Sequence, residues 1–289
     1  MTDLDVNPMG YPPDEIDRQY NARESVPDCL PFLQEYTDSS KQARDQLDGT
    51  LSVPYGSHPD ETLDIFPAAH ADAPVFVFIH GGYWRALSKD DSSFMAPAFT
   101  AAGATVVVVN YSLAPSASLP AIVDQCRRAV AWVYKHIGQF HGDAARIHVS
   151  GSSAGGHLAA MVLANGWHDA LNVPRHIVHS ASPISGLFDL RPLLSTHINA
   201  WANLDAQSAQ ALSPVFHLPE QGCPILLAWG EHETAEFKRQ SQVYAGAWQA
   251  RGYTAQTLEV SGVNHFNILM DLCDPYSVLS RSILDLMGL

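Results

Sequence analysis

Residues 146–160 read RIHVSGSSAGGHLAA, and this stretch decides the fold. An apolar run that favours a β-strand ends at a cluster of small residues, and a helix-forming run follows it. Residues 151–155 match the pattern G-x-S-x-G, with Ser153 at the centre. Between a strand and a helix, this pattern predicts a sharp turn that holds a serine hydroxyl above the carboxyl end of a sheet. Ser152 stands one residue too early, and the alternative interpretation is an ordinary glycine-rich turn.

Apolar runs of strand length recur on both sides of this stretch. They occupy residues 62–68, 73–80, 104–111, 145–151, 176–183, 223–230 and 255–262. Most are apolar throughout, as expected for parallel strands covered on both faces, whereas the last is more polar and therefore belongs nearer an edge. Amphipathic helical patterns at 119–140 and 234–252 lie between them. The alternation predicts an α/β fold with a doubly wound, mostly parallel sheet and helices on both faces.

The first 50 or so residues differ from the rest of the chain. They are polar, with apolar residues at helical spacing, namely Ile16, Tyr20, Phe32, Leu33 and Tyr36. We expect one or two helices here, interrupted at Pro27 and Pro31. Because so short a segment cannot bury a core of its own, the prediction is a single domain over residues 1–289, with residues 1–50 as a helical extension packed on it.

Composition limits the classes of partner. The chain has 16 Lys and Arg residues against 30 Asp and Glu, a net charge of −14, which argues against nucleic-acid binding. Its four cysteines form no C-x-x-C pair, so zinc and redox motifs are not indicated. The N-terminal residues do not resemble a signal peptide, and no apolar run reaches membrane-spanning length. We therefore expect a cytoplasmic protein without a nucleic-acid or membrane partner, and the sequence leaves open whether it forms a homodimer.

A serine nucleophile needs a base and an acid that orients the base. In the chain order that accompanies this turn, the histidine follows the last strand, and of the fourteen histidines only His265 lies there. The acid is expected in the loop after residues 223–230, where Glu231 and Glu233 compete and Glu236 is a third candidate. Loop geometry favours Glu233, because it stands where the loop bends back toward the histidine. The alternative for each carboxylate is a solvated side chain.

The backbone amides that would stabilise an oxyanion are expected in two places. One is Ala154, directly after the nucleophile, and the other is the loop after an earlier strand. The segment FIHGGYW at 78–84 provides this loop, and Gly81 and Gly82 allow the backbone to aim N–H groups at a developing alkoxide. The alternative is an ordinary glycine-rich loop.

Together these stretches resemble the α/β-hydrolase superfamily over residues 50 to 289, and within it the kynurenine formamidase (arylformamidase) family and related esterases. The resemblance is carried by HGGYW at 80–84, GSSAGGHLAA at 151–160, GEHETAEFKRQS at 230–241, GVNHFNIL at 262–269 and QYNAR at 19–23. The family usually has an aspartate in the third stretch, and the matching position here is Glu233. This departure is compatible with hydrolysis but weakens the inference that the substrate is the family's usual one.

The resemblance implies a serine hydrolase that removes a formyl group from an aryl amine such as kynurenine, with Ser153, His265 and Glu233 as the triad and no metal or organic cofactor. Tyr83, Trp84 and Phe266 would form an aromatic wall for the small-molecule substrate, joined by Trp201. The alternative for each aromatic residue is core packing, which we expect above all for Trp201.

The sequence distinguishes three other functions to different degrees. A carboxylesterase or amidase acting on short acyl groups differs little in sequence from an arylformamidase. A non-catalytic binding protein on the same fold is disfavoured, since such proteins commonly lose a triad residue and all three positions are filled here. Nucleotide binding is disfavoured because no G-x-G-x-x-G follows the first strand.

Overall fold

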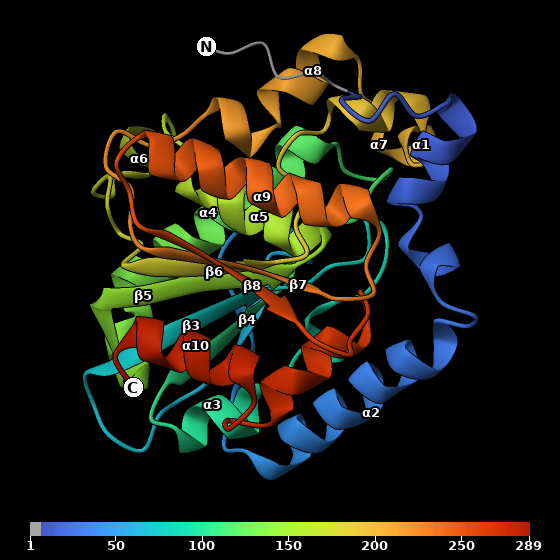
Figure 1. The fold of residues 1–289 in the computed structure, drawn as a ribbon. Coiled ribbons are helices and arrows are strands. Elements are labelled where there is room, and N and C mark those ends of the chain that lie inside the picture. The colour runs from blue at the N-terminus through green and yellow to red at the C-terminus, as the bar shows by residue number, and fades with distance from the viewer. Residues whose placement is uncertain (1–6) are drawn as a thin grey trace.

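The computed structural model describes residues 7–289, so the first six residues of the predicted N-terminal extension lie outside the described part of the chain (Figure 1). The described residues form an eight-stranded sheet in the order β1-β2-β4-β3-β5-β6-β7-β8. The strands are β1 (Thr50–Pro54), β2 (Thr62–Phe66), β3 (Ala73–Ile79), β4 (Thr105–Val109), β5 (Gly142–Ser152), β6 (Ser180–Ile184), β7 (Ile225–Gly230) and β8 (Ala255–Val260). Only the pairs β1–β2 and β2–β4 are antiparallel within this sheet. The predicted mostly parallel sheet and the edge position of β8 are confirmed.

One strand, β1, is not predicted by the sequence pattern. Its five residues are mostly exposed and carry no alternating apolar pattern. Pairing with β2 forms it, and this long-range contact leaves little trace in local composition.

Helices cover both faces of the sheet (Figure 1). They are α1 (Pro13–Tyr20), α2 (Leu30–Gln46), α3 (Ala96–Ala101), α4 (Leu119–His136), α5 (Ala154–Leu163), α6 (His168–Leu171), α7 (Asn199–Ala202), α8 (Ala206–Ala211), α9 (Ala235–Ala250) and α10 (Val278–Met287). Val75, Val77 and Ile79 of β3 pack in one core with α4, α5 and α9, whereas Phe76 and Phe78 pack in the other with α3 and α10. No helix in the described residues is long and apolar enough to span a membrane.

The N-terminal segment forms two helices, as predicted, but Pro31 does not interrupt either of them. It lies in the first turn of α2, where a missing N–H costs no helical hydrogen bond. In Figure 1 this segment (blue) runs from α1, beside α7, to α2 on the opposite face of the sheet.

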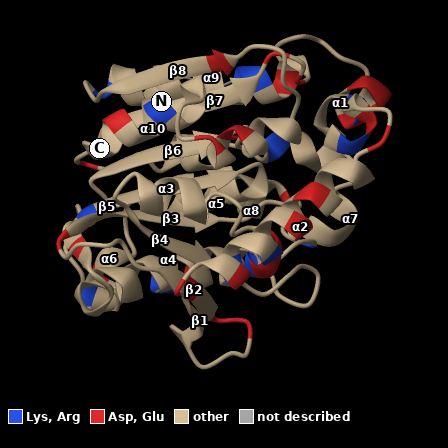
Figure 2. Cartoon of the chain, turned by 90° about the horizontal axis from the view of Figure 1, so that it is seen from below, with Lys and Arg blue, Asp and Glu red and all other residues tan. Residues whose placement is uncertain are grey.

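Acidic residues occur on α1 and beside β1, and the other charged residues are scattered over the chain (Figure 2).

Candidate active site

Ser153 lies in the sharp turn between β5 and α5. Its φ of 56° and ψ of −118° fall in a region that non-glycine residues rarely adopt. Such strain persists only where the surrounding structure holds it. Gly155 shows how closely the turn packs, because a Cβ there would lie 2.0 Å from the Ile79 carbonyl oxygen. The small residues around the serine therefore let the turn pack directly against the end of β3.

His265 and Glu233, 32 residues apart, are joined by a buried hydrogen bond. The distance from His265 Nδ1 to Glu233 Oε2 is 2.8 Å, and the glutamate side chain has no exposed surface. The other oxygen, Oε1, accepts hydrogen bonds from Ser185 Oγ at 2.5 Å and from the Gly230 N–H at 2.7 Å. Since an ionised carboxylate only accepts, Nδ1 carries the proton and Nε2 is left free to act as a base.

The two competing glutamates are engaged elsewhere. Glu231 accepts hydrogen bonds from Ser261 Oγ and the Gly262 N–H, which lower the pKa of this exposed carboxyl below its ordinary value. Glu236 accepts from Tyr20 Oη and pairs with Arg239. Of the three candidates, Glu233 is the one in contact with the histidine.

The glycine loop after β3 lies against the serine. A Cβ at Gly81 would lie 2.7 Å from the Ser152 carbonyl oxygen and 3.4 Å from Ser153 Cβ, and Gly82 has a φ of +93° that favours glycine. Tyr111 donates a hydrogen bond from its hydroxyl to the His80 carbonyl and stacks on the His80 ring at 4.0 Å. Burial lowers the pKa of His80 to about 4, so this ring is neutral and packs as part of the core.

The third predicted oxyanion residue, Ala154, opens α5 and is fully buried. It directly follows the strained serine, so its amide belongs to the same turn. Ala154 therefore adjoins Ser153 in the turn, and Gly81 approaches the same serine from the loop after β3.

A cavity of about 300 Å³ brings these groups together. The residues that line it include Ser153, His265, Gly81, Gly82, Tyr83, Phe266 and Trp201. The predicted nucleophile and base therefore face the same space, although they are 112 residues apart in the chain. The volume falls at the lower end of the range for small-molecule sites.

Two of the three aromatic residues predicted to contact substrate line this cavity, and Trp84 does not. Trp84 is fully buried, and its Nε1 donates to Nδ1 of His157 at 3.2 Å. Positive φ angles at both Tyr83 and Trp84 turn the backbone there and send the indole into the core behind the loop. Trp201, expected to be core, is only partly buried and lines the cavity.

The N-terminal segment contributes to the cavity in a way that the sequence motifs did not reveal. The residues of this segment that line the cavity are Asn21, Ala22, Arg23, Leu33 and Tyr36. Tyr36 donates a hydrogen bond from its hydroxyl to the carbonyl of Phe266, and Phe32 stacks on the Phe266 ring at 5.9 Å. Because Phe266 follows the histidine, α2 supports the loop that carries His265. The helical spacing of Phe32 and Tyr36 predicted a buried face but not what that face would cover.

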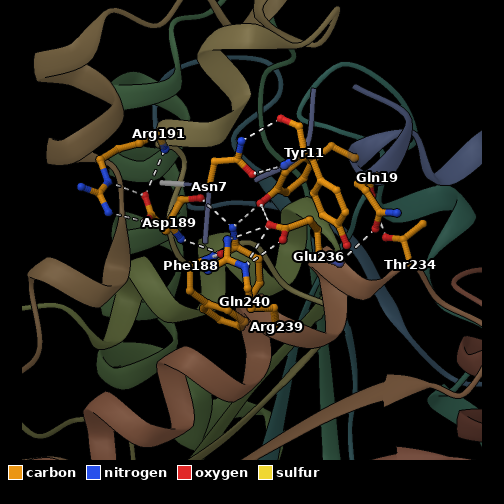
Figure 3. Close-up of polar contacts among 11 residues, drawn as sticks. Asn7, Tyr11, Gln19, Phe188, Asp189, Arg191, Thr234, Glu236, Arg239 and Gln240 are labelled. Atoms are coloured by element: carbon orange, nitrogen blue, oxygen red, sulfur yellow. Dashed lines mark hydrogen bonds and ion pairs between the residues drawn. The ribbon is translucent and has the colours of Figure 1, made fainter. Parts of the chain in front are cut away.

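Polar contacts fasten α1 to the start of α9 (Figure 3). Thr234 Oγ1 donates to the Gln19 carbonyl, and Gln19 Oε1 accepts from the Glu236 N–H. Tyr20, which is fully buried, donates to Glu236 and accepts from Gln240 Nε2. The helix that precedes the cavity-lining residues Asn21–Arg23 is thereby tied to the helix that follows Glu233.

The sequence and the fold of this chain are similar to those of known proteins. A family model described as BD-FAE matches residues 63–183, which include the glycine loop and the serine turn. A kynurenine formamidase from Danio rerio is 32% identical over 288 residues, covering 95% of this chain and 96% of that protein. Esterase LipQ from Mycobacterium tuberculosis is 27% identical over 75% of this chain and 56% of its own length. A solved structure from silicibacter sp. tm1040, described as a candidate thioesterase, superposes with a TM-score of 0.83 at 29% identity, covering 93% of this chain and 98% of that one.

Proposed function

Because the chain belongs to the kynurenine formamidase family of α/β-hydrolases, we propose that it is a serine hydrolase that removes the formyl group from N-formylkynurenine or a similar aryl formamide. The observation that carries this proposal is the 2.8 Å hydrogen bond between His265 and Glu233 beside a cavity that Ser153 also lines. These three side chains supply a nucleophile, a base and an orienting acid.

In the first half of the reaction, Ser153 Oγ attacks the formyl carbon while His265 Nε2 takes the hydroxyl proton. Glu233 stabilises the imidazolium that forms and keeps the ring oriented. The N–H groups of Gly81, Gly82 and Ala154 would donate hydrogen bonds to the carbonyl oxygen, on which negative charge develops. When the C–N bond breaks, the histidine passes its proton to the departing amine nitrogen, leaving Ser153 as a formyl ester.

In the second half, water replaces the amine. His265 takes a proton from the water, the resulting hydroxide adds to the formyl ester, and the serine leaves with the proton returned by the histidine. The sum is formamide plus water giving amine plus formic acid, which ionises to formate and a proton, and the enzyme is regenerated.

The aromatic side chains that line the cavity support a small aromatic substrate. Aromatic rings of Tyr36, Tyr83, Trp201 and Phe266 line it together with aliphatic side chains. Flat rings of this kind favour a planar aryl group by stacking and edge contacts. A formyl group is the smallest acyl group, so most of the cavity would hold the amine.

Activity and labelling of the full-length protein test this proposal. Hydrolysis of N-formylkynurenine should release formate, and Ser153→Ala should lower kcat by about 10³-fold or more. A fluorophosphonate should label the wild type and the matched Ser152→Ala variant but not Ser153→Ala. An unchanged rate in Ser153→Ala would overturn the mechanism, and absence of labelling in all three proteins would favour a binding protein on this fold.

A second candidate is a carboxylesterase for short acyl groups. The similarity to esterase LipQ over three quarters of the chain favours it, and the same triad would perform the reaction. Hydrolysis of p-nitrophenyl acetate or butyrate without any turnover of formanilides would replace the formamide proposal by this one.

We also propose that the protein acts in the cytoplasm. All four cysteines are free thiols, and two of them are buried, which suits a reducing compartment. Labelling of the thiols in protein taken directly from cells tests this, since cysteines held as disulfides in the native protein would contradict it.

A further inference from the structure

Two arginines belong to the lining of the cavity, although the protein as a whole is acidic. Arg23 and Arg85 belong to its lining, and no Asp or Glu of the described residues does. This contrasts with the net charge of −14 carried by the whole chain. On an acidic protein, a local positive charge attracts a negatively charged ligand to that site, whereas the rest of the surface repels it.

Arg23 and Arg85 are exposed residues, and neither has an acidic partner among the described residues. Several other arginines of the chain pair with carboxylates, such as Arg128 with Glu61 and Arg239 with Glu236. Within residues 7–289, no ion pair involves Arg23 or Arg85, and neither side chain donates a hydrogen bond. His197, a further lining residue, already pairs with Asp17 at 2.7 Å. The two arginines are therefore the free cations of the lining.

The side chain of Arg85 is held in place without hydrogen bonds from its guanidinium N–H groups. Its guanidinium lies 4.3 Å from the centroid of the Trp201 ring, and Trp201 Nε1 donates to the Tyr83 carbonyl at 3.0 Å. Stacking on an aromatic face orients the guanidinium while its edge remains available for a carboxylate. The stack thus preorganises Arg85 as an anion-binding group.

Arg23 reaches the same cavity from a different part of the chain. It lies in the short 3-10 helix Ala22–Ser25, directly after α1. The hydrogen bonds of Gln19 and Tyr20 to α9 fasten the preceding residues. Two segments that are 62 residues apart therefore present one cation each to the same space.

We propose that Arg23 and Arg85 form an anion-recognition site that selects substrates with a carboxylate on the part released as the amine. The proposal rests on the proposed function, because a formyl group has no room for a charge and the anion must then belong to the amine. The absence of acidic side chains among the described lining residues also disfavours substrates whose only charge is positive. The site would thus determine which aryl formamides are used.

A pair of probes that differ only in charge tests the site. They are 2-formamidobenzoate, an anion, and 2-formamidobenzamide, its neutral counterpart. We would compare wild type, Arg85→Gln, Arg23→Gln, the double variant and the charge-conserving Arg85→Lys. Arg251→Gln is the matched control, because Arg251 is exposed, has no ion pair within the described residues and lies at the far end of α9.

Each single arginine-to-glutamine change should raise KM for the anionic probe about fivefold, with kcat within about twofold of the wild type. KM for the neutral probe should not change, and Arg85→Lys should recover part of the loss. Added salt should raise KM of the wild type for the anionic probe only. Equal effects on both probes, or no effect of the double variant, would overturn the proposal.

A second pair of probes separates this inference from the proposed function. If the wild type hydrolyses neither formamide, formamidase activity fails, and the comparison moves to 4-acetoxybenzoate and 4-acetoxybenzamide. These esters place the same charge difference on the leaving group. A KM increase confined to the acetoxybenzoate would support the arginine site, whereas equal behaviour of the two esters would reject it.

Discussion

At the scale of single residues, the hydrogen bonds of one carboxylate distinguish three glutamates that lie within six positions. Glu233 uses both oxygens, one for His265 and the other for Ser185 and Gly230. Glu231 instead joins the turn after β8, through Ser261 and Gly262. A residue's role at this site thus depends on which partner the loop brings to it rather than on its chemistry alone.

Glu233→Gln should lower kcat by about 10³- to 10⁴-fold. An amide has one acceptor oxygen, so it cannot receive all three donors, and its NH₂ group would oppose the His265 Nδ1–H. Steady-state kinetics on a formamide and on p-nitrophenyl acetate measure the loss. Glu231→Gln is the control and should keep its activity to within about twofold, because both hydrogen bonds of Glu231 go to one oxygen, and an amide retains an oxygen that can accept two. A larger loss in the control than in Glu233→Gln would reverse the assignment.

At the scale of elements, the N-terminal helices form part of the active-site wall. The α1 helix is fastened to α9, and α2 contacts the loop that carries His265. Tyr83 of the glycine loop also donates to the carbonyl of Tyr20 at 2.5 Å. Tyr20 therefore links α9, through its hydroxyl, to the loop expected to form the oxyanion site, through its carbonyl.

Tyr20→Phe should destabilise the protein by about 1–3 kcal/mol, because it removes the hydroxyl that donates to the buried carboxylate of Glu236 and accepts from buried Gln240. Loosening the end of α1 should also raise KM more than it lowers kcat, since the wall of the cavity moves and the triad does not. Urea unfolding and steady-state kinetics give the two values. Tyr276→Phe, at an exposed tyrosine, should change neither. Unaltered stability and KM in Tyr20→Phe would show that this contact does not hold the helix.

At the scale of the whole molecule, buried histidines link stability to pH. His148 in β5 lies beside Phe76 and hydrogen-bonds to Ser180 and Ser182, and burial lowers its pKa to about 3. Between pH 6.5, the ordinary pKa of histidine, and pH 3, the His148 ring binds a proton in the unfolded chain but stays neutral in the folded chain. The stability contributed by this neutral ring is therefore complete above pH 6.5 and decreases as the pH falls toward 3.

Tm should fall as the pH is lowered from 7.5 to 5, and His148→Asn should reduce the size of that fall. The comparison uses the change in Tm with pH, so a uniform loss of stability in the variant does not affect it. Differential scanning calorimetry at several pH values measures both. His70→Asn, at an exposed histidine, is the control and should retain the wild-type pH dependence. An identical pH dependence in His148→Asn would refute the linkage.

The sequence pattern is sufficient to predict the fold and those site residues whose type and position along the chain both fit their expected role. The resemblance to kynurenine formamidases is confirmed by the 32% identity over almost the whole chain, and the α/β-hydrolase fold by the sheet and its structural relatives. Ser153 could be named because a strand–serine–helix turn needs small neighbours, and His265 because it follows the last strand. Their catalytic roles, the single-domain description and the oligomeric state remain predictions.

The sequence by itself determined the strands of the parallel sheet and the strained turn, because each depends on residues close together in the chain. It also gave the order of the three candidate triad residues, because each is expected directly after a strand. Only the tertiary structure decided that Trp84 packs in the core while Trp201 lines the cavity, that α2 supports the histidine loop, and that Arg23 and Arg85 face one space. These features depend on contacts between segments tens to hundreds of residues apart. Local periodicity can say that such a side chain is buried, but it does not specify what the side chain is buried against.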